Sequence, residues 1–292
     1  MILLKKIYLL NLIMKLDIIK IFKTIIKDEF DDNYHTRKYT EEKYFQEIIT
    51  FLRNETYWNR HNGDITGKVL NNKHNSYIKK GIYEKIYKYI LNVYMSHNKT
   101  KKLKYQSTDT SFICNRQGYG VNVSRNKFYK GKRGIKICSI VDSNGVAIAI
   151  MISSGSTYDC KVVSELFDNM LIDTKSVLYS NHNRYKQYFL ADSGFDSKEI
   201  STLLEEKGYD VIIPMNKRNT KDPKKIRKLT PEQKKIYKKR IIVENSYAWI
   251  KAYPVLNRMN QKTIKSYMGL LFLANSLILI KKVTTELSKT KL

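Results

Sequence analysis

The sequence has 292 residues, and its 54 Lys plus Arg outnumber its 27 Asp plus Glu, which gives a formal net charge of +27. Hydrophobic residues make up 42% of the chain and aromatic residues 12%, enough for the core of one large domain or two ordinary ones. This composition excludes wholesale disorder, a collagen-like repeat and a disulfide-stapled miniprotein. The positive excess favours a polyanionic partner, most simply a nucleic acid, although an AT-rich genome also encodes abundant Lys, Ile, Asn and Tyr.

The cysteines and the two apolar ends of the chain bear on its compartment. Cys114, Cys138 and Cys160 form no Cys-x-x-Cys pair, which indicates a reducing compartment and argues against a zinc finger. Lysines interrupt the apolar N-terminus and no small-residue cleavage site follows it, so we expect an amphipathic helix, with Met14 as an alternative start. The apolar segment Met268–Ile280 is short for a bilayer and is typical of a buried core helix, so we expect no membrane partner.

The first hundred residues have the periodicity of helices. Apolar side chains recur at helical spacing in Tyr44–Leu52 and in Ile82–Tyr94, on either side of a polar connection around Trp58–Asn75. The basic segment Ser96–Lys104 that follows is typical of a linker. The expected organisation is an all-helical N-terminal region at residues 1–98, a second domain at residues 99–285 and a polar tail at residues 286–292.

Beyond the linker, β-type segments alternate with helical ones. The Asn-Gly pair in Asp142–Gly145 predicts a hairpin turn, because such turns require positive backbone angles. The order of elements predicts a mixed sheet flanked by helices, hence an α/β fold. The predicted strands are Tyr105–Cys114, Gly134–Val141, Val146–Ser153, Tyr188–Ala191 and Val211–Met215, and the predicted helices are Asp159–Met170, Ser197–Lys207 and about Pro231–Lys251.

The last of these helices carries four polar residues in one stripe. At about 100° per residue, Tyr237, Arg240, Glu244 and Lys251 project to the same side, opposite an apolar back face. Taken alone, this stripe is best explained as an exposed helix face with an i, i+4 Arg–Glu pair.

Two aspartates make the stripe more informative. Asp109 is a charge in the middle of a predicted strand, and Asp192 directly follows the strand Tyr188–Ala191, at a strand end where α/β sheets place ligands. If these aspartates converge with Glu244, their oxygens suit two Mg²⁺ or Mn²⁺ ions, which can promote in-line displacement at phosphorus. In that setting Arg240 and Lys251, the two cations of the stripe, are suited to bind DNA phosphates.

These residues carry a resemblance to a known family. The spacing Tyr237-x2-Arg240-x3-Glu244-x6-Lys251 is similar to the Tyr-Arg-Glu-Lys signature of bacterial insertion-sequence transposases with a DDE catalytic triad. The segments DTSF, KGKRGIKICSIVDSNGVAIAIMISSGSTYD, LADSGFDS and RIIVENSYAWIK resemble successive blocks of that family, in its order. The resemblance covers about residues 38 to 282 and is strongest in the second half.

The resemblance implies a fold, a site and an activity. The fold is an RNase H-like mixed five-stranded sheet flanked by helices, in which Asp109, Asp192 and Glu244 are the catalytic residues and bind two divalent ions, Mg²⁺ or Mn²⁺. By the same resemblance, Asp109 is expected to bridge both ions. By the same resemblance, we expect the N-terminal region to bind the terminal inverted repeats, and the enzyme to cleave them by hydrolysis and join the 3′ hydroxyls to target DNA by transesterification. Tyr237, Arg240 and Lys251 are the implied DNA contacts of the signature.

The expected setting follows from the same resemblance. We expect the protein to act as a homodimer on double-stranded DNA inside the cell, in the nucleoid or cytoplasm of a prokaryote, or otherwise in a nucleus or a viral replication site. Two alternatives remain: a transposase-derived DNA-binding protein, and an RNase H-like nuclease without strand transfer.

Other polar residues have simpler explanations. Asp142 suits its hairpin, whereas Asp159 and Asp196 suit helix caps, although Asp159 can also support the site indirectly. His182 is typical of a surface loop. Two basic segments, one with Lys130, Lys132 and Arg133 and the other at Lys221–Lys228, suit either DNA backbone contacts or solvated loops.

Overall fold

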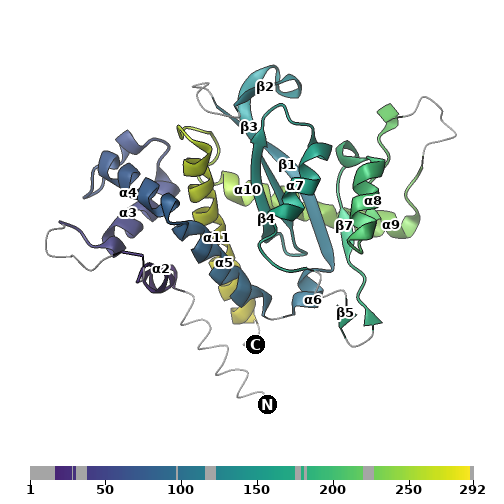
Figure 1. Ribbon diagram of the computed structural model, residues 1–292, viewed down its shortest axis with the longest axis horizontal. Coiled ribbons are helices and arrows are strands. Elements are labelled where there is room, and N and C mark those ends of the chain that lie inside the picture. The colour runs from purple at the N-terminus through teal and green to yellow at the C-terminus, as the bar shows by residue number, and fades with distance from the viewer. Residues whose placement is uncertain are drawn as a thin grey trace, which may run out of the picture. The chain divides into compact units, whose positions relative to one another are not determined.

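The computed structural model describes residues 17–27, 29–30, 38–96, 98–115, 123–174, 179–180, 183–219 and 227–289. Met14, His182 and residues 221–226 of the second basic segment therefore lie outside the described residues. Contacts divide the chain into two compact units, one of Met1–Tyr94 with Ile250–Leu292 and one of Met95–Trp249. Figure 1 shows helices in the first unit and the sheet in the second.

The second unit is built on a mixed sheet. β1, β3 and β4 form antiparallel pairs, whereas β7 and β8 run parallel to β1, in the order β2-β3-β1-β7-β8 with β4 also paired to β3. The short β2 is an addition to the five expected strands, which are all present. This arrangement with flanking helices confirms the RNase H-like α/β fold. The strands are β1 Tyr105–Cys114, β2 Ser124–Asn126, β3 Lys132–Val141, β4 Ala147–Ser154, β7 Tyr188–Leu190 and β8 Asp210–Ile212, with a separate pair of β5 Tyr179–Ser180 and β6 Asn183–Arg184.

The turn between β3 and β4 differs in one detail from the expected Asn-Gly geometry. Gly145 has a φ of 76°, whereas Asn144 does not have a positive φ. The Asp142 carboxylate closes the turn by accepting hydrogen bonds from the amides of Asn144 and Val146, at 2.9 and 2.8 Å. The expected role of Asp142 in its hairpin is therefore confirmed.

Short helices connect and flank the strands. The expected single helix Pro231–Lys251 is wrong in one respect, because a 3₁₀ turn at Lys238–Arg240 interrupts it. Thr230 and Gln233 form a capping box that starts the first of the two resulting helices. The elements are α6 Lys99–Lys102, η4 Asp159–Val162, α7 Val163–Asp168, η6 Ser193–Phe195, α8 Lys198–Glu206, η7 Lys217–Asn219, α9 Pro231–Tyr237, η9 Lys238–Arg240 and α10 Ile241–Lys251.

The first unit is helical, as expected for the N-terminal region. The polar connection expected around Trp58–Asn75 is largely structured, because it holds a 3₁₀ turn and most of α4. Leu70, His74 and Tyr77 of α4 share one face and are fully buried, while the Asn and Lys residues that suggested a loop lie on the other faces. The elements are α2 Ile18–Ile26, α3 Glu41–Asn54, η2 Trp58–Arg60, α4 Gly67–Lys79, α5 Ile82–Met95 and α11 Ile264–Lys289.

Helix α11 contains the expected core helix Met268–Ile280 and packs against α2, α3 and α4. By length and composition alone, its segment 264–285 is long and apolar enough to cross a membrane, but 56% of the most apolar window is buried within the protein. A core helix passes the same test. Contacts thus group residues 250–292 with the N-terminal helices, whereas the expected second domain ran to residue 285. Residues 290–292 of the expected tail lie outside the described residues.

Candidate active site

Asp109 interrupts the burial of the central strand β1. The strand is buried on both sides of Asp109 and Thr110, and the Asp109 side chain keeps 21% of its surface exposed. Its Oδ1 accepts a hydrogen bond from the Thr110 amide at 2.7 Å, and its Oδ2 accepts one from Arg240 at 3.2 Å. Burial raises the pKa of Asp109 to about 6, and nearby carboxylates add to the rise, while the Thr110 amide and Arg240 oppose it.

Arg240 joins the strand to the helix. Its Nη1 donates to Asp109 Oδ2 and its Nη2 donates to Glu244 Oε1 at 2.5 Å, one helical turn further on. The guanidinium also lies over the Tyr237 ring, with its carbon 5.8 Å from the ring centroid. The 3₁₀ turn does not disrupt the expected stripe, since three of its residues remain in contact. Lys251 is half-buried in the last turn of α10.

Asp192 lies two residues after the end of β7 and is the N-cap of a 3₁₀ turn. Its Oδ1 accepts a hydrogen bond from the Gly194 amide at 2.7 Å, which fixes the carboxylate at the strand end. Its negative charge helps to raise the pKa values of Asp109 and Tyr237, for which burial is the main cause. The three expected catalytic carboxylates thus come from β1, the end of β7 and α10, and Asp192 is electrostatically coupled to Asp109.

The donor set suits a hard divalent cation, because all three candidate ligands are carboxylates. Asp192 and Glu244 each have one oxygen that accepts no hydrogen bond from the described residues. Asp109 has one oxygen bound to the Thr110 amide and one bound to Arg240. Nevertheless, among the described residues no three His, Cys, Asp or Glu side chains lie close enough together to hold a metal ion. Asp109 and Glu244 instead lie on either side of one guanidinium.

Tyr247 anchors α10 to the sheet, a role that its place in the sequence did not indicate. Its hydroxyl donates to the Asp109 carbonyl at 2.5 Å and accepts a hydrogen bond from Ser139 Oγ at 2.9 Å. Burial raises the pKa of Tyr247 well above its usual value, so the hydroxyl stays protonated as the donor. The only sequence signal was the position of Tyr247 three residues after Glu244, on an adjacent face of the helix.

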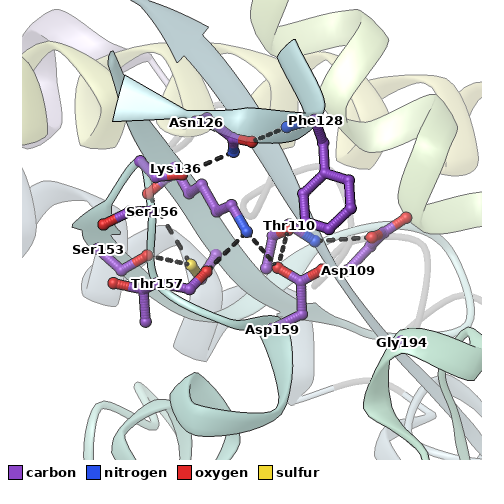
Figure 2. A network of polar contacts seen from close by, with 12 residues as sticks. Asp109, Thr110, Asn126, Phe128, Lys136, Ser153, Ser156, Thr157, Asp159 and Gly194 are labelled. Carbon is purple, nitrogen blue, oxygen red and sulfur yellow. Dashed lines mark hydrogen bonds and ion pairs between the residues drawn. The ribbon is translucent and has the colours of Figure 1, made fainter. Parts of the chain in front are cut away.

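A second polar network adjoins the Asp109 carboxylate through Thr110, its neighbour on β1 (Figure 2). Asp159 Oδ1 accepts hydrogen bonds from Thr110 Oγ1 and from Lys136 Nζ, both at 2.7 Å. Lys136 also donates to the Thr157 carbonyl at 2.8 Å, and its side chain is only 9% exposed. The expected helix cap at Asp159 is therefore wrong, because the carboxylate pairs with a nearly buried cation.

The expected helix cap at Asp196 is also wrong. Its Oδ2 accepts a hydrogen bond from the Asn216 amide at 2.8 Å, and Ser197, not Asp196, occupies the N-cap of α8. Asp196 therefore ties the start of α8 to the segment that follows β8.

The first basic segment forms an exposed turn between β2 and β3. Lys130, Lys132 and Arg133 are all exposed, and no acidic residue occurs between residues 123 and 141. Phe128 in the same turn is 75% exposed, whereas Tyr129 stacks on Phe112 of β1 with ring centroids 4.5 Å apart. The turn thus presents cations and an aromatic ring to solvent, beside the strand that carries Asp109. This combination suits a nucleic acid.

Comparisons with known proteins bear on the family of this chain. No curated protein matches the sequence. A family model described as the transposase DDE domain matches residues 116–274, more than half of the chain. The match includes Asp192 and Glu244 and begins seven residues after Asp109, which accepts a hydrogen bond from Arg240 within the matched range. The chain therefore belongs to the transposase DDE domain family.

Proposed function

We propose that this transposase binds the ends of its element, cleaves them and joins the 3′ hydroxyls to target DNA, with Asp109, Asp192 and Glu244 as its catalytic carboxylates. The observation that carries the proposal is the Arg240 guanidinium, which hydrogen-bonds carboxylates from β1 and α10. This contact joins Asp109 and Arg240, which are 131 residues apart in the sequence, within the RNase H-like fold. The third carboxylate, Asp192, is coupled electrostatically to the first.

The three carboxylates would hold two divalent cations, Mg²⁺ or Mn²⁺. These ions supply charge stabilisation for an in-line displacement at phosphorus and assist the entering and leaving oxygens. The fixed backbone of β1 and the Gly194 amide position two of the carboxylates before DNA arrives. The Asp109 carboxyl is ionised above its pKa of about 6, which favours it as a ligand at neutral and alkaline pH.

The basic residues suit the DNA partner. Arg240, with the Tyr237 ring beside it, would contact phosphates near the cleavage point, and Lys251 would contact phosphates of the same DNA. The turn with Lys130, Lys132 and Arg133 would follow the backbone of the duplex. The helices of the first unit would bind the terminal inverted repeats. Because two ends must be cut together, we also propose that the protein acts as a homodimer on DNA inside the cell.

A strand-transfer assay tests the proposal. The substrate is a labelled duplex made from the inverted repeats that flank the gene, with a supercoiled plasmid as target and Mg²⁺ or Mn²⁺. We expect wild type to cut and join the duplex, and Asp192→Asn to lose at least about 10²-fold in rate while still binding DNA. Asp196→Asn, which changes a nearby aspartate bound to a backbone amide, is the matched control.

The outcomes separate the proposal from its alternatives. Equal activity of wild type and Asp192→Asn contradicts the catalytic assignment. Cleavage without joining indicates a nuclease, and specific binding of the repeats without any cleavage indicates a DNA-binding protein descended from a transposase.

A further inference from the structure

The position of Arg240 between two candidate metal ligands has a consequence for metal binding. Its side chain is 18% exposed, so the cation is largely withdrawn from water. The same two carboxylate groups that accept its hydrogen bonds, Asp109 and Glu244, are those proposed to hold the divalent cations. The inference below therefore rests on the proposed function.

The local structure holds the guanidinium in this place. Arg240 ends the 3₁₀ turn before α10, which places Glu244 one helical turn away on the same side. The Tyr237 ring packs on the guanidinium. Burial lowers the pKa of Arg240, but Tyr237, Asp109 and Glu244 outweigh this effect and raise it. Two separate N–H groups reach two carboxylates, a geometry that the planar fork of arginine provides and a lysine ammonium does not.

We infer that Arg240 is the internal counter-cation of this site: it holds Asp109 and Glu244 together and must leave them when a divalent cation binds. A metal ion bonded to oxygen at roughly 2.0–2.1 Å needs the space and the oxygen lone pairs that the guanidinium occupies. The displaced guanidinium keeps its charge and becomes available to a DNA phosphate, which couples metal binding to DNA binding.

Manganese binding to the full-length protein, measured by calorimetry without DNA, tests the inference. At pH 8 the Asp109 carboxyl, with a pKa of about 6, is ionised in wild type. We expect Arg240→Gln to bind Mn²⁺ about tenfold more tightly than wild type, because no charge-assisted hydrogen bonds have to be broken. Arg240→Lys keeps the charge but cannot bridge both carboxylates, so we expect an intermediate affinity.

Lys239→Gln is the matched control. It removes the same charge from the adjacent residue, whose ammonium is exposed and lies 4.9 Å from the centroid of the Tyr105 ring. We expect its Mn²⁺ affinity to stay within about twofold of wild type, because salt screens the interaction of exposed charges. A tenfold gain in both variants would show a general charge effect and overturn the inference.

The remaining outcomes distinguish this inference from the proposed function. If Arg240→Gln and Arg240→Lys bind Mn²⁺ no more tightly than wild type, while Asp192→Asn binds it more weakly, the counter-cation role is wrong and the metal site stands. If Asp192→Asn binds Mn²⁺ as wild type does, or if no variant binds it, both fail. Circular dichroism spectra of each variant establish that the fold is retained before affinities are compared.

Discussion

The burial of Asp109 gives a quantitative prediction for stability. Its pKa of about 6, against 3.8 for an exposed aspartate, means that the folded protein disfavours the ionised carboxyl. At about 1.4 kcal/mol per pKa unit, the ionised form costs at most about 3 kcal/mol of folding free energy. Asparagine has the shape of the protonated carboxyl and carries no charge, so Asp109→Asn removes this cost.

The sign of the effect depends on pH. Because the folded pKa is raised, the stabilisation from the protonated carboxyl is complete below about pH 4 and is lost as the pH rises through about 6. We therefore expect Asp109→Asn and wild type to be equally stable at pH 4, and Asp109→Asn to be more stable by up to about 3 kcal/mol at pH 8.

Urea unfolding without metal ions, followed by circular dichroism at both pH values, measures this difference. Asp168→Asn, at the exposed end of α7, is the matched control for removal of a carboxylate. A stability difference between Asp109→Asn and wild type that does not change with pH would refute the argument that burial governs this carboxyl.

Three further predictions concern residues outside the triad. Lys136→Met leaves the Asp159 carboxylate without its cation, so we expect unfolding free energy to fall by about 2 kcal/mol in urea titrations, and Lys136→Met with Asp159→Asn to recover most of it. Burial lowers the pKa of His74 to about 4. The neutral ring therefore stabilises the fold above pH 6.5, and this stabilisation is lost as the pH falls through 4. Between pH 7 and pH 4, the unfolding free energy of wild type should fall by up to about 3 kcal/mol more than that of His74→Gln. Gly145→Ala should lower the melting temperature by several degrees, because φ is 76° and the added Cβ would lie 3.0 Å from Trp249; an unchanged melting curve would contradict this packing.

Patterns of apolar residues predicted a strand correctly where the segment's own residues determine its structure. The strands β1, β3 and β4 lie within two residues of their expected ranges, because continuous apolar residues bounded by turn signals leave few alternatives. Helix α4 was missed because its polar residues outnumber its apolar ones, and only its packing against other helices shows which face is buried. The break at η9 was missed because residues 231–251 have no proline or glycine within the helical part to mark it.

The roles of single polar residues were harder to predict. Asp159 and Asp196 stand just before helices, as caps do, yet each carboxylate binds groups from distant segments. Sequence spacing contains no information about which cation or amide will be adjacent once the sheet has formed. Tyr247 was overlooked for the same reason, since its partners Ser139 and Asp109 lie on two other elements.

By itself the sequence determined the main strands, the Tyr-Arg-Glu-Lys spacing and the short-range Arg240–Glu244 pair, because residues four apart on a helix are always neighbours. Only the tertiary structure decided that Arg240 also reaches Asp109, 131 residues earlier, and that burial raises the pKa of that carboxyl. The physical reason is that hydrogen bonds and desolvation across a sheet depend on strand pairing and helix packing, which set distances that no local spacing encodes.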